Sequence, residues 1–241
     1  MKVSRYRKED PVSYLLGATV VMEYLINKPG SVKGVILHPK FNAEDTIAKI
    51  KDITGRYKIP LSVEEKPFNI LSQKENCFVI GVIGKSEDKI KDGNHVVLVN
   101  PSNAGNLGTI IRSQIGFDVK DLAIILPAVD VFDPKTIRAS MGALSRIRVE
   151  TFKSFDDYRA RFPGNNYYPF MLDGSVRLQD TEIKEPFSLI MGNEATGLPA
   201  EFAGIGQPIR IEHTGGIDSL NLPIATGIGL YHATKGRFSG K

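Results

Sequence analysis

Three stretches of this 241-residue chain place glycines and polar residues after a short apolar run and before a helical pattern. They are Asn100-Pro-Ser-Asn-Ala-Gly-Asn-Leu-Gly-Thr-Ile-Ile-Arg112, Leu189-Ile-Met-Gly-Asn-Glu-Ala-Thr-Gly-Leu-Pro-Ala-Glu201, and the segment 211–231. Turns of this composition expose backbone N–H groups and tolerate positive φ, so they can lie against the polar groups of a ligand. Each stretch alone also fits a capped turn between a strand and a helix in any doubly wound protein.

Polar side chains that could act on a ligand stand at defined places in these stretches. Arg112 lies on the polar flank of a predicted helix, where a solvated arginine is the alternative. Glu194 follows a strand, where open α/β sheets place their ligand crevices, although an acid there can also cap the next helix. Ser219 and Asn221 precede Pro223, which fixes the start of the last helix, so either of them can be its cap.

Two glycines interrupt that last helical pattern. Gly227 and Gly229 are costly in a helix interior, because glycine loses more conformational freedom there than any other residue. We therefore expect another backbone or a ligand to approach the helix closely at these positions.

The elements that would position these residues alternate between strands and helices. Apolar strands are predicted at 95–100, 122–126, 168–172, 187–191 and 208–211, with helices between them. Such near-continuous apolar strands indicate an α/β fold whose sheet is mainly parallel and covered on both faces. A smaller α/β unit over residues 1–84 precedes it, beginning with a helical stripe over 11–26 and including a third strand at 77–83. The charged, glycine-bounded segment 85–94 is the predicted linker, and 95–241 the second domain.

The composition limits the partners and the cellular compartment that we expect for the protein. The net charge is +4 with a pI near 9.0, which permits a polyanionic partner without requiring one. A single cysteine, Cys77, indicates a reducing compartment, and we expect a cytoplasmic protein. We expect no membrane segment and no metal, because no long apolar run or cluster of metal-ligand residues is present in the sequence. Residues 1–10 are read as a solvated tail, with an arm that touches phosphate as the alternative.

Taken together, the motifs are far more specific than each alone. The set Asn-Leu-Gly-x-Ile-Ile-Arg, Gly-Asn-Glu-x-x-Gly-Leu and Ser-Leu-Asn-x-x-x-Ala resembles the three motifs of the SpoU/TrmH branch of the SPOUT RNA methyltransferases. The resemblance covers residues 95–235, and the runs Ile137–Leu144 and Leu172–Gly174 fit it. The front unit resembles, more loosely, the ribosomal-protein-like α/β/α domain that binds substrate in many members, with Gly17, Glu23 and residues 71–75 fitting.

This resemblance implies methyl transfer from S-adenosylmethionine to a ribose 2′-hydroxyl of RNA, a catalytic domain with a deep trefoil knot, and a homodimer. Residues matching the family's catalytic positions are Asn106, Arg112, Glu194, Ser219 and Asn221. Those expected around S-adenosylmethionine are Leu172, Gly174, Met191, Gly192, Asn193, Gly197, Ile211 and Leu220. Leu222-Pro223 departs from the small or β-branched residues of many members, which should not remove activity because it falls in the first helical turn.

Methyl transfer requires alignment of hydroxyl, methyl and sulfur more than acid catalysis. Arg112 would orient the hydroxyl and a neighbouring phosphate, because a guanidinium stays protonated in proteins. The proton could then pass to a phosphate oxygen, Ser219 or Glu194, and these alternatives stay open. Further basic side chains could extend a phosphate-binding face: Arg138, Arg146, Arg148, Lys33, Lys40 and Lys58.

Two other classes of function compete with this interpretation. A non-catalytic RNA-binding or assembly factor would keep the fold, but it has no need of all five matched polar residues. A nicotinamide-dependent dehydrogenase is disfavoured, because the chain lacks the Gly-x-Gly-x-x-Gly spacing with a later acid. Within the family we favour ribosomal RNA over transfer RNA as substrate, because the front unit suits a structured ribosomal element.

Overall fold

The computed structural model describes residues 3–71, 77–172, 175–214 and 216–238. The chain forms two compact units. Unit 1 comprises residues 1–86 and 130–146, and unit 2 comprises residues 87–129 and 147–241. Residues 130–146 pack with unit 1 although they lie between two strands of unit 2. The assignment of a substrate-binding domain, a linker and a catalytic domain to these ranges stays a prediction.

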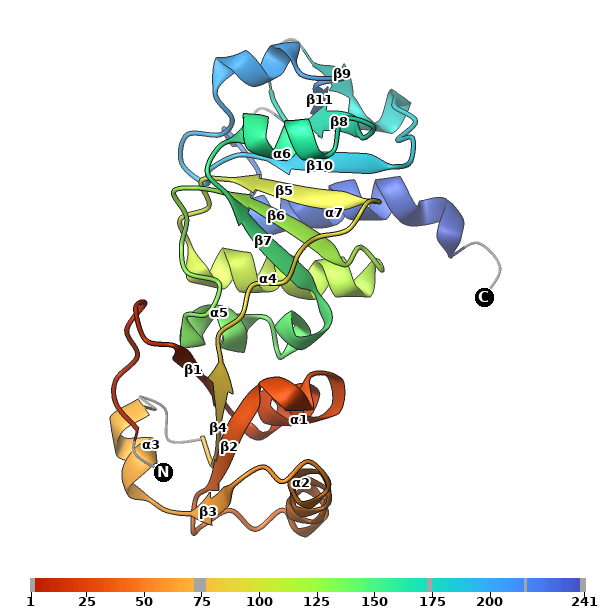
Figure 1. Ribbon diagram of the computed structural model, residues 1–241. Helices are drawn as coiled ribbons and strands as arrows, with labels where there is room; N and C mark the ends of the chain where they lie inside the picture. The colour runs from red at the N-terminus through yellow and green to blue at the C-terminus, as the bar shows by residue number, and fades with distance from the viewer. Residues whose placement is uncertain (1–2, 72–76, 173–174, 215, 239–241) are drawn as a thin grey trace. The chain divides into compact units, whose positions relative to one another are not determined.

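Unit 1 is built on a mixed four-stranded sheet (Figure 1). Its elements are β1 Val12–Leu16, α1 Ala18–Asn27, β2 Val32–Leu37, α2 Glu44–Arg56, β3 Leu61–Val63, α3 Lys66–Leu71, β4 Val79–Gly84 and α5 Pro134–Ala139, with 3-10 turns at Pro29–Ser31 and Ala143–Arg146. The strand order is β1-β4-β2-β3; β4 runs antiparallel to both of its neighbours, and β2 and β3 are parallel.

Side-chain alternation along these strands gives unit 1 two apolar layers. Tyr14, Ile36 and Ile80 point to one face and pack with Phe68 of α3. The intervening positions of the strands, such as Leu15, Val35 and Ile83, are equally buried, and α1 and α2 lie on the side of the sheet opposite α3 (Figure 1). Unit 1 is thus a three-layered α/β/α structure, while its likeness to a ribosomal protein stays a prediction.

The first element of unit 1 differs from the sequence-based expectation. The apolar positions between Pro11 and Ile26 predict one helix, yet the chain forms strand β1, turns at Gly17 with φ +113°, and only then begins α1. Val12, Leu15 and Leu16 fit a helical stripe as well as a buried strand, so periodicity could not separate the two. The glycine marks the change, because its positive φ is the conformation that other residues rarely adopt.

Unit 2 contains a five-stranded sheet in which every neighbouring pair is parallel. Its elements are β5 His95–Val99, α4 Ala104–Gly116, β6 Asp121–Ile125, β7 Arg148–Phe152, α6 Phe155–Arg161, β8 Asn166–Pro169, β9 Val176–Arg177, β10 Phe187–Met191, β11 Ile209–Arg210 and α7 Leu222–Thr234, with 3-10 turns at Leu178–Asp180, Ala200–Gly204 and Lys235–Arg237. The order is β7-β6-β5-β10-β8, and β9 pairs with β11 in a separate two-stranded sheet. The predicted α/β fold with a mainly parallel sheet is confirmed.

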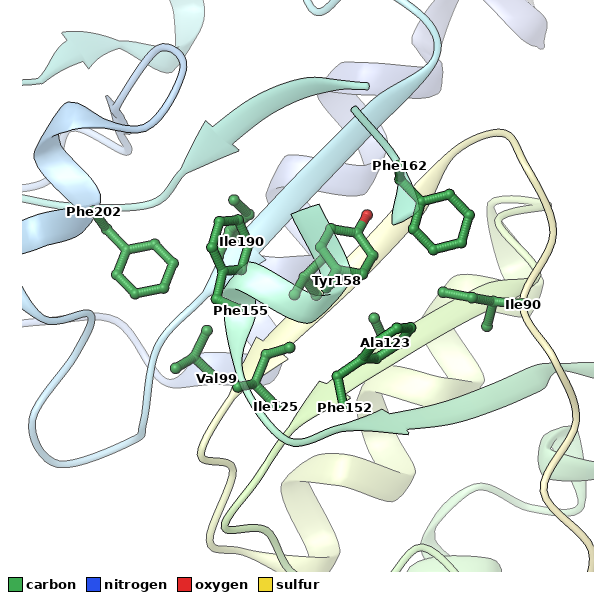
Figure 2. Close-up of a cluster of buried hydrophobic side chains, with 11 residues drawn as sticks. Ile90, Val99, Ala123, Ile125, Phe152, Phe155, Tyr158, Phe162, Ile190 and Phe202 are labelled. Carbon is green, nitrogen blue, oxygen red and sulfur yellow. The ribbon is translucent and has the colours of Figure 1, made fainter. Parts of the chain in front are cut away.

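Helices cover both faces of this sheet. α4 and α7 pack together on one face, and α7 also contacts β10. On the other face α6 covers an aromatic cluster that Figure 2 shows over the strands. Its buried members are Ile90, Val97, Val99, Ala123, Ile125, Phe152, Phe155, Tyr158, Phe162, Ile190 and Phe202. Burial of both faces explains why the strand sequences read as continuous apolar runs.

The charged segment 85–94 has ordered contacts with unit 2 from residue 87 onwards. The carboxylate of Glu150 accepts hydrogen bonds from the Ile90 N–H at 2.9 Å and the Lys89 ammonium at 2.8 Å. The Lys91 N–H donates to Asp121 at 3.1 Å, and the side chain of Ile90 is buried in the aromatic cluster. The charged composition of this segment predicts a solvated linker. In the structure, acids on β6 and β7 accept hydrogen bonds from residues 89–91 and hold them against unit 2.

Within the described ranges, none of the helices combines the length and apolar character needed to cross a membrane. The trefoil knot stays a prediction.

Candidate active site

The three motif stretches meet at one edge of the unit 2 sheet. Because all five strands are parallel, their carboxyl ends lie at the same edge. The turn after β5 carries residues 100–103, the end of β8 carries 170–172, and the turn after β10 carries 192–199. The parallel bridge between Phe170 and Ile209 brings the segment before Ile211 to this edge as well. Sequence segments about a hundred residues apart thus surround one site.

Glu194 joins the first two motifs through four hydrogen bonds. Its carboxylate accepts from the Ser102 N–H at 3.0 Å, the Ser102 hydroxyl at 2.7 Å, the Asn103 N–H at 3.1 Å and the Asn106 side-chain amide at 3.2 Å. Partial burial would raise the pKa of Glu194, but the hydrogen bonds from Ser102 and Asn106 outweigh it, and the pKa lies below its usual value. The carboxylate is therefore held as an anion between two turns.

The turn after β10 is closed by its own backbone and by Asn193. Asn193 and Gly197 exchange backbone hydrogen bonds, while the Asn193 side chain donates to the Asn100 carbonyl at 2.7 Å and accepts from the Ala195 N–H at 2.9 Å. A β-carbon built on Gly192 would lie 2.2 Å from the carbonyl carbon of Gly197, and Gly197 itself has φ +67°. Both glycines are thus required by this tight turn.

A pocket of about 430 Å³ opens beside this turn. Its wall consists of Phe170, Met171, Leu172, Met191, Gly192, Asn193, Glu194, Ala195, Thr196, Gly197, Leu198, Ile209, Arg210, Ile211, His213, Asp218, Ser219, Leu220, Leu222 and Ala225. Its volume lies in the range of about 300–1,000 Å³ that is usual for small-molecule and cofactor pockets. The wall combines apolar side chains, two glycines and four ionisable side chains.

The structure brings together most of the residues singled out in the sequence. Those that line the pocket are Leu172, Met191, Gly192, Asn193, Glu194, Gly197, Ile211, Ser219 and Leu220. Asn106 reaches the site through its bond to Glu194. Gly174, also expected around S-adenosylmethionine, lies outside the described residues.

Arg112 and Asn221 do not form part of the pocket wall. Arg112 is exposed on α4 and makes no hydrogen bond or ion pair with any residue that the structure describes. Asn221 occupies the N-cap position of α7, as the sequence predicts, but its side chain makes no capping hydrogen bond and is exposed. Both polar groups therefore face outward from unit 2 and are available to a ligand.

Several pocket residues were not singled out in the sequence. Phe170 is the clearest: a β-carbon built on Gly229 would lie 2.6 Å from Phe170 Cζ, so α7 approaches this ring closely. The glycine was a signal of close approach, but the partner is an aromatic side chain rather than a backbone or ligand. A β-carbon built on Gly227 would meet no atom within 4 Å beyond the backbone of its own helix. Arg210 at the end of β11, and His213 and Asp218 in the loop after it, were missed because they are isolated charged residues, for which solvation is the usual explanation.

The ionisable groups of the described ranges do not include three His, Cys, Asp or Glu residues placed to hold a metal ion. The expectation of a metal-free site stays a prediction.

Comparisons with known proteins agree with the fold and the motifs. The chain is 31% identical to the 23S rRNA (uridine(2479)-2′-O)-methyltransferase of Streptomyces viridochromogenes over 156 residues. The matched residues are 61% of this chain and 54% of that relative. It is 25% identical to the 23S rRNA (guanosine(2553)-2′-O)-methyltransferase RlmP of Bacillus subtilis (strain 168), over 91% of this chain and 88% of the relative. Relatives named as transfer RNA 2′-O-methyltransferases also match, over 59% and 55% of this chain.

A solved structure resembles the chain across both units. The crystal structure of an rRNA methyltransferase from Sinorhizobium meliloti with bound S-adenosylmethionine superposes with a TM-score of 0.83 at 29% identity, covering 97% of this chain and 90% of that one. The model of the SpoU rRNA Methylase family matches residues 93–231, more than half of the sequence. The resemblance expected from the three motifs is confirmed, and the protein belongs to the SpoU rRNA Methylase family.

Proposed function

We propose that this protein methylates a ribose 2′-hydroxyl of ribosomal RNA, with S-adenosylmethionine as the methyl donor. As a SpoU-family member it is an RNA methyltransferase that uses this cofactor. The observation that carries the proposal is the pocket at the carboxyl edge of the sheet, where nine of the residues predicted from the motifs form the wall. A relative and a solved structure named as ribosomal RNA methyltransferases match over 91% and 97% of this chain. Another ribosomal RNA relative matches over 61%, and the relatives named as transfer RNA enzymes match over 59% and 55%.

The pocket residues fit this donor chemically. Leu172, Leu198 and Leu220 offer apolar surface for a flat adenine ring, and the glycine turn at 192–197 lines the same pocket. Asp218 and Glu194 are acids on the wall, and they suit a ligand that carries an ammonium and a sulfonium charge. When bound, the donor supplies an activated methyl group; alignment of the acceptor falls to the protein.

Glu194 is better suited to positioning than to accepting a proton. Its four hydrogen bonds occupy the carboxylate, and its lowered pKa makes it a weak base. Through Asn106 and the Ser102–Asn103 backbone it fixes the start of α4, the helix that carries Arg112. Of the three acceptors left open by the sequence, Ser219 on the pocket wall and a phosphate oxygen of the RNA are therefore favoured.

Arg112 is the group proposed to orient the ribose hydroxyl and the adjacent phosphate. Its exposed guanidinium, without an ion pair among the described residues, can form bidentate bonds to a phosphate. Because it stays protonated, its contribution is orientation and charge stabilisation rather than proton abstraction.

Helix α7 supports the expectation of a homodimer. One of its faces packs on α4 and β10, yet Ile224, Ile228 and Tyr231 on the other remain 55%, 38% and 62% exposed. These residues recur at helical spacing, so they form one apolar stripe beside the pocket residues Leu222 and Ala225. Contiguous apolar surface of this kind marks an interaction site more often than a solvated face.

Two measurements test the proposed function. Calorimetric titration of the purified protein with S-adenosylmethionine should show saturable binding at one site per chain. Mapping of 2′-O-methyl groups in ribosomal and transfer RNA, from cells with and without the gene, should show one ribosomal position lost. Donor binding with no lost position would favour a non-catalytic RNA-binding factor, and a lost transfer RNA position would replace the substrate class.

A further inference from the structure

We propose that the N-terminal arm, residues 3–10, is a fixed phosphate-contacting surface through which the enzyme holds its RNA. The inference rests on the proposed function, because it presumes an RNA substrate. It concerns residues outside the pocket and outside the three motifs. Residues 3–10 form no helix or strand, so the contacts that hold them in place require an explanation.

The arm is fastened to unit 1 by the side chain of Tyr6. Its hydroxyl donates a hydrogen bond to the carboxylate of Asp130, which lies 124 positions away in the sequence. The ring packs against the apolar cluster around Tyr14 and Phe68, together with Val3. Burial and the bond to Asp130 raise the pKa of Tyr6, so the hydroxyl keeps its proton and remains a donor.

The side chain of Lys85 holds the arm at a second point, by contacts to the backbone of the arm. The ammonium donates to the carbonyl of Lys8 at 2.9 Å and to that of Arg7 at 3.4 Å, lies 4.4 Å from the centre of the Tyr6 ring, and pairs with Asp130 at 3.8 Å. The side chains of Lys85 and Asp130 are only 13% and 16% exposed. Lys85 and Asp130 therefore form an ion pair with each other and hydrogen bonds with the arm, and neither charge is directed to solvent.

The same contacts direct the remaining cations of the arm outward. Arg5, Arg7 and Lys8 are all exposed, and none forms an ion pair with a residue in the described part of the chain. The arm is thus held by one tyrosine and by backbone carbonyls, while three basic side chains remain free. Cations held in advance in this way lose less entropy when they bind phosphate than those of a disordered tail.

The charge distribution favours RNA as the partner of this surface. Unit 1 contains seventeen basic and eleven acidic residues, a formal charge of +6, whereas unit 2 contains fourteen and sixteen, a formal charge of −2. The excess positive charge of the protein therefore resides in the unit that carries the arm. A polyanion is attracted to such a unit over several ångströms and is retained by direct contacts to its phosphates.

Charge reversal in the full-length protein tests the inference. The arm variant is Arg5→Glu/Arg7→Glu/Lys8→Glu. The control is Lys49→Glu/Lys51→Glu/Lys66→Glu, which changes three exposed lysines on α2 and α3 and alters the net charge equally. Dissociation constants for an unmodified 23S rRNA transcript are measured from about 50 to about 300 mM KCl, because the slope against salt counts phosphate contacts.

We expect the arm variant to bind the transcript at least tenfold more weakly at the low end of this range, with a salt slope smaller by about 2, at roughly 0.7–0.9 for each lost contact. The control should lose less than threefold and keep its slope. Equal losses in the two variants would overturn the inference, since only net charge would then matter. Calorimetry with S-adenosylmethionine separates the two proposals. If the wild type binds the donor and methylates RNA while the arm and control variants bind the transcript equally, only the proposal about the arm is refuted.

Discussion

The side-chain amide of Asn106 donates a hydrogen bond to the carboxylate of Glu194 at 3.2 Å, across 88 positions of sequence. With the bonds from Ser102 and Asn103, it couples the start of α4 to the turn after β10, which lines the pocket. Any change in this carboxylate should therefore affect stability and turnover together.

Glu194→Gln tests that coupling. The substituted amide would place a donor against the Ser102 and Asn103 N–H groups, so we expect the free energy of unfolding to fall by about 0.5–1.5 kcal/mol, the usual net contribution of a hydrogen bond. Turnover should fall as well, because the start of α4 would no longer be fixed. Chemical denaturation and methyl-transfer kinetics measure both effects. Glu201→Gln, at an exposed acid after the same turn, should change neither. An unchanged denaturation midpoint for Glu194→Gln would contradict the coupling.

Arg112→Ala tests the proposed orienting role. Because Arg112 is exposed and lies off the pocket wall, its removal should leave protein stability unaltered. Turnover should fall about a hundredfold or more, as expected when a group that aligns and stabilises the reacting atoms is lost. Arg159→Ala removes an exposed arginine from α6 on the other face of the sheet and is the control. Single-turnover methylation and calorimetry with S-adenosylmethionine separate chemistry from binding; a collapse of donor affinity would show that the assigned role is wrong.

The two glycines of α7 provide a matched pair of variants. Gly229→Ala would bring a methyl group within 2.6 Å of the Phe170 ring, which must then shift in the pocket wall. We expect affinity for S-adenosylmethionine to weaken about tenfold, equivalent to ~1.4 kcal/mol. Gly227→Ala would meet no atom within 4 Å beyond the backbone of its own helix and should instead stabilise the helix by about 0.5–1 kcal/mol. Calorimetry measures the affinity of both variants for S-adenosylmethionine, and thermal unfolding measures their stability. Similar donor affinities in the two variants would show that Phe170 does not contact the ligand.

The sequence predicted the site more completely than it predicted the arm. Glycine turns that follow apolar strands can be recognised in the sequence, because few residues other than glycine fit a turn such as 192–197. The strand β1 was misread as helix, since its spacing fits both periods. The order of residues 3–10 depends on Asp130, whose position relative to Tyr6 arises only in the folded chain. Long-range partners of this kind leave no local pattern.

A buried histidine should make the stability of the protein sensitive to acid. His95 is fully buried: its Nε2 faces the Lys91 carbonyl at 2.6 Å, which requires an N–H there, so Nδ1 accepts from the Tyr158 hydroxyl at 2.7 Å. Burial lowers the pKa of His95 below its usual value. The unfolded chain therefore takes up a proton that the folded chain resists, and stability present above about pH 6.5 is lost as the pH falls below it.

Thermal unfolding between about pH 7.5 and pH 5 measures this loss. His95→Gln should be less stable at neutral pH, because it disturbs the bond to Tyr158, but its midpoint should decline less steeply with acid than that of the wild type. Parallel declines in the two proteins would show that other groups cause the acid sensitivity.

The apolar stripe on α7 should hold two copies of the chain together. Ile228 stands in the middle of the stripe between Ile224 and Tyr231, and a charge placed there would remain unpaired if a second copy covered it. Ile228→Asp should therefore convert a dimer to a monomer in sedimentation-velocity experiments, and turnover should fall if the second copy completes the donor site. Ile26→Asp, at a more exposed apolar residue on α1, is the control and should leave the sedimentation coefficient unchanged. A wild-type protein that sediments as a monomer at micromolar concentration would refute the dimer, whereas a dimer that survives Ile228→Asp would place its interface elsewhere.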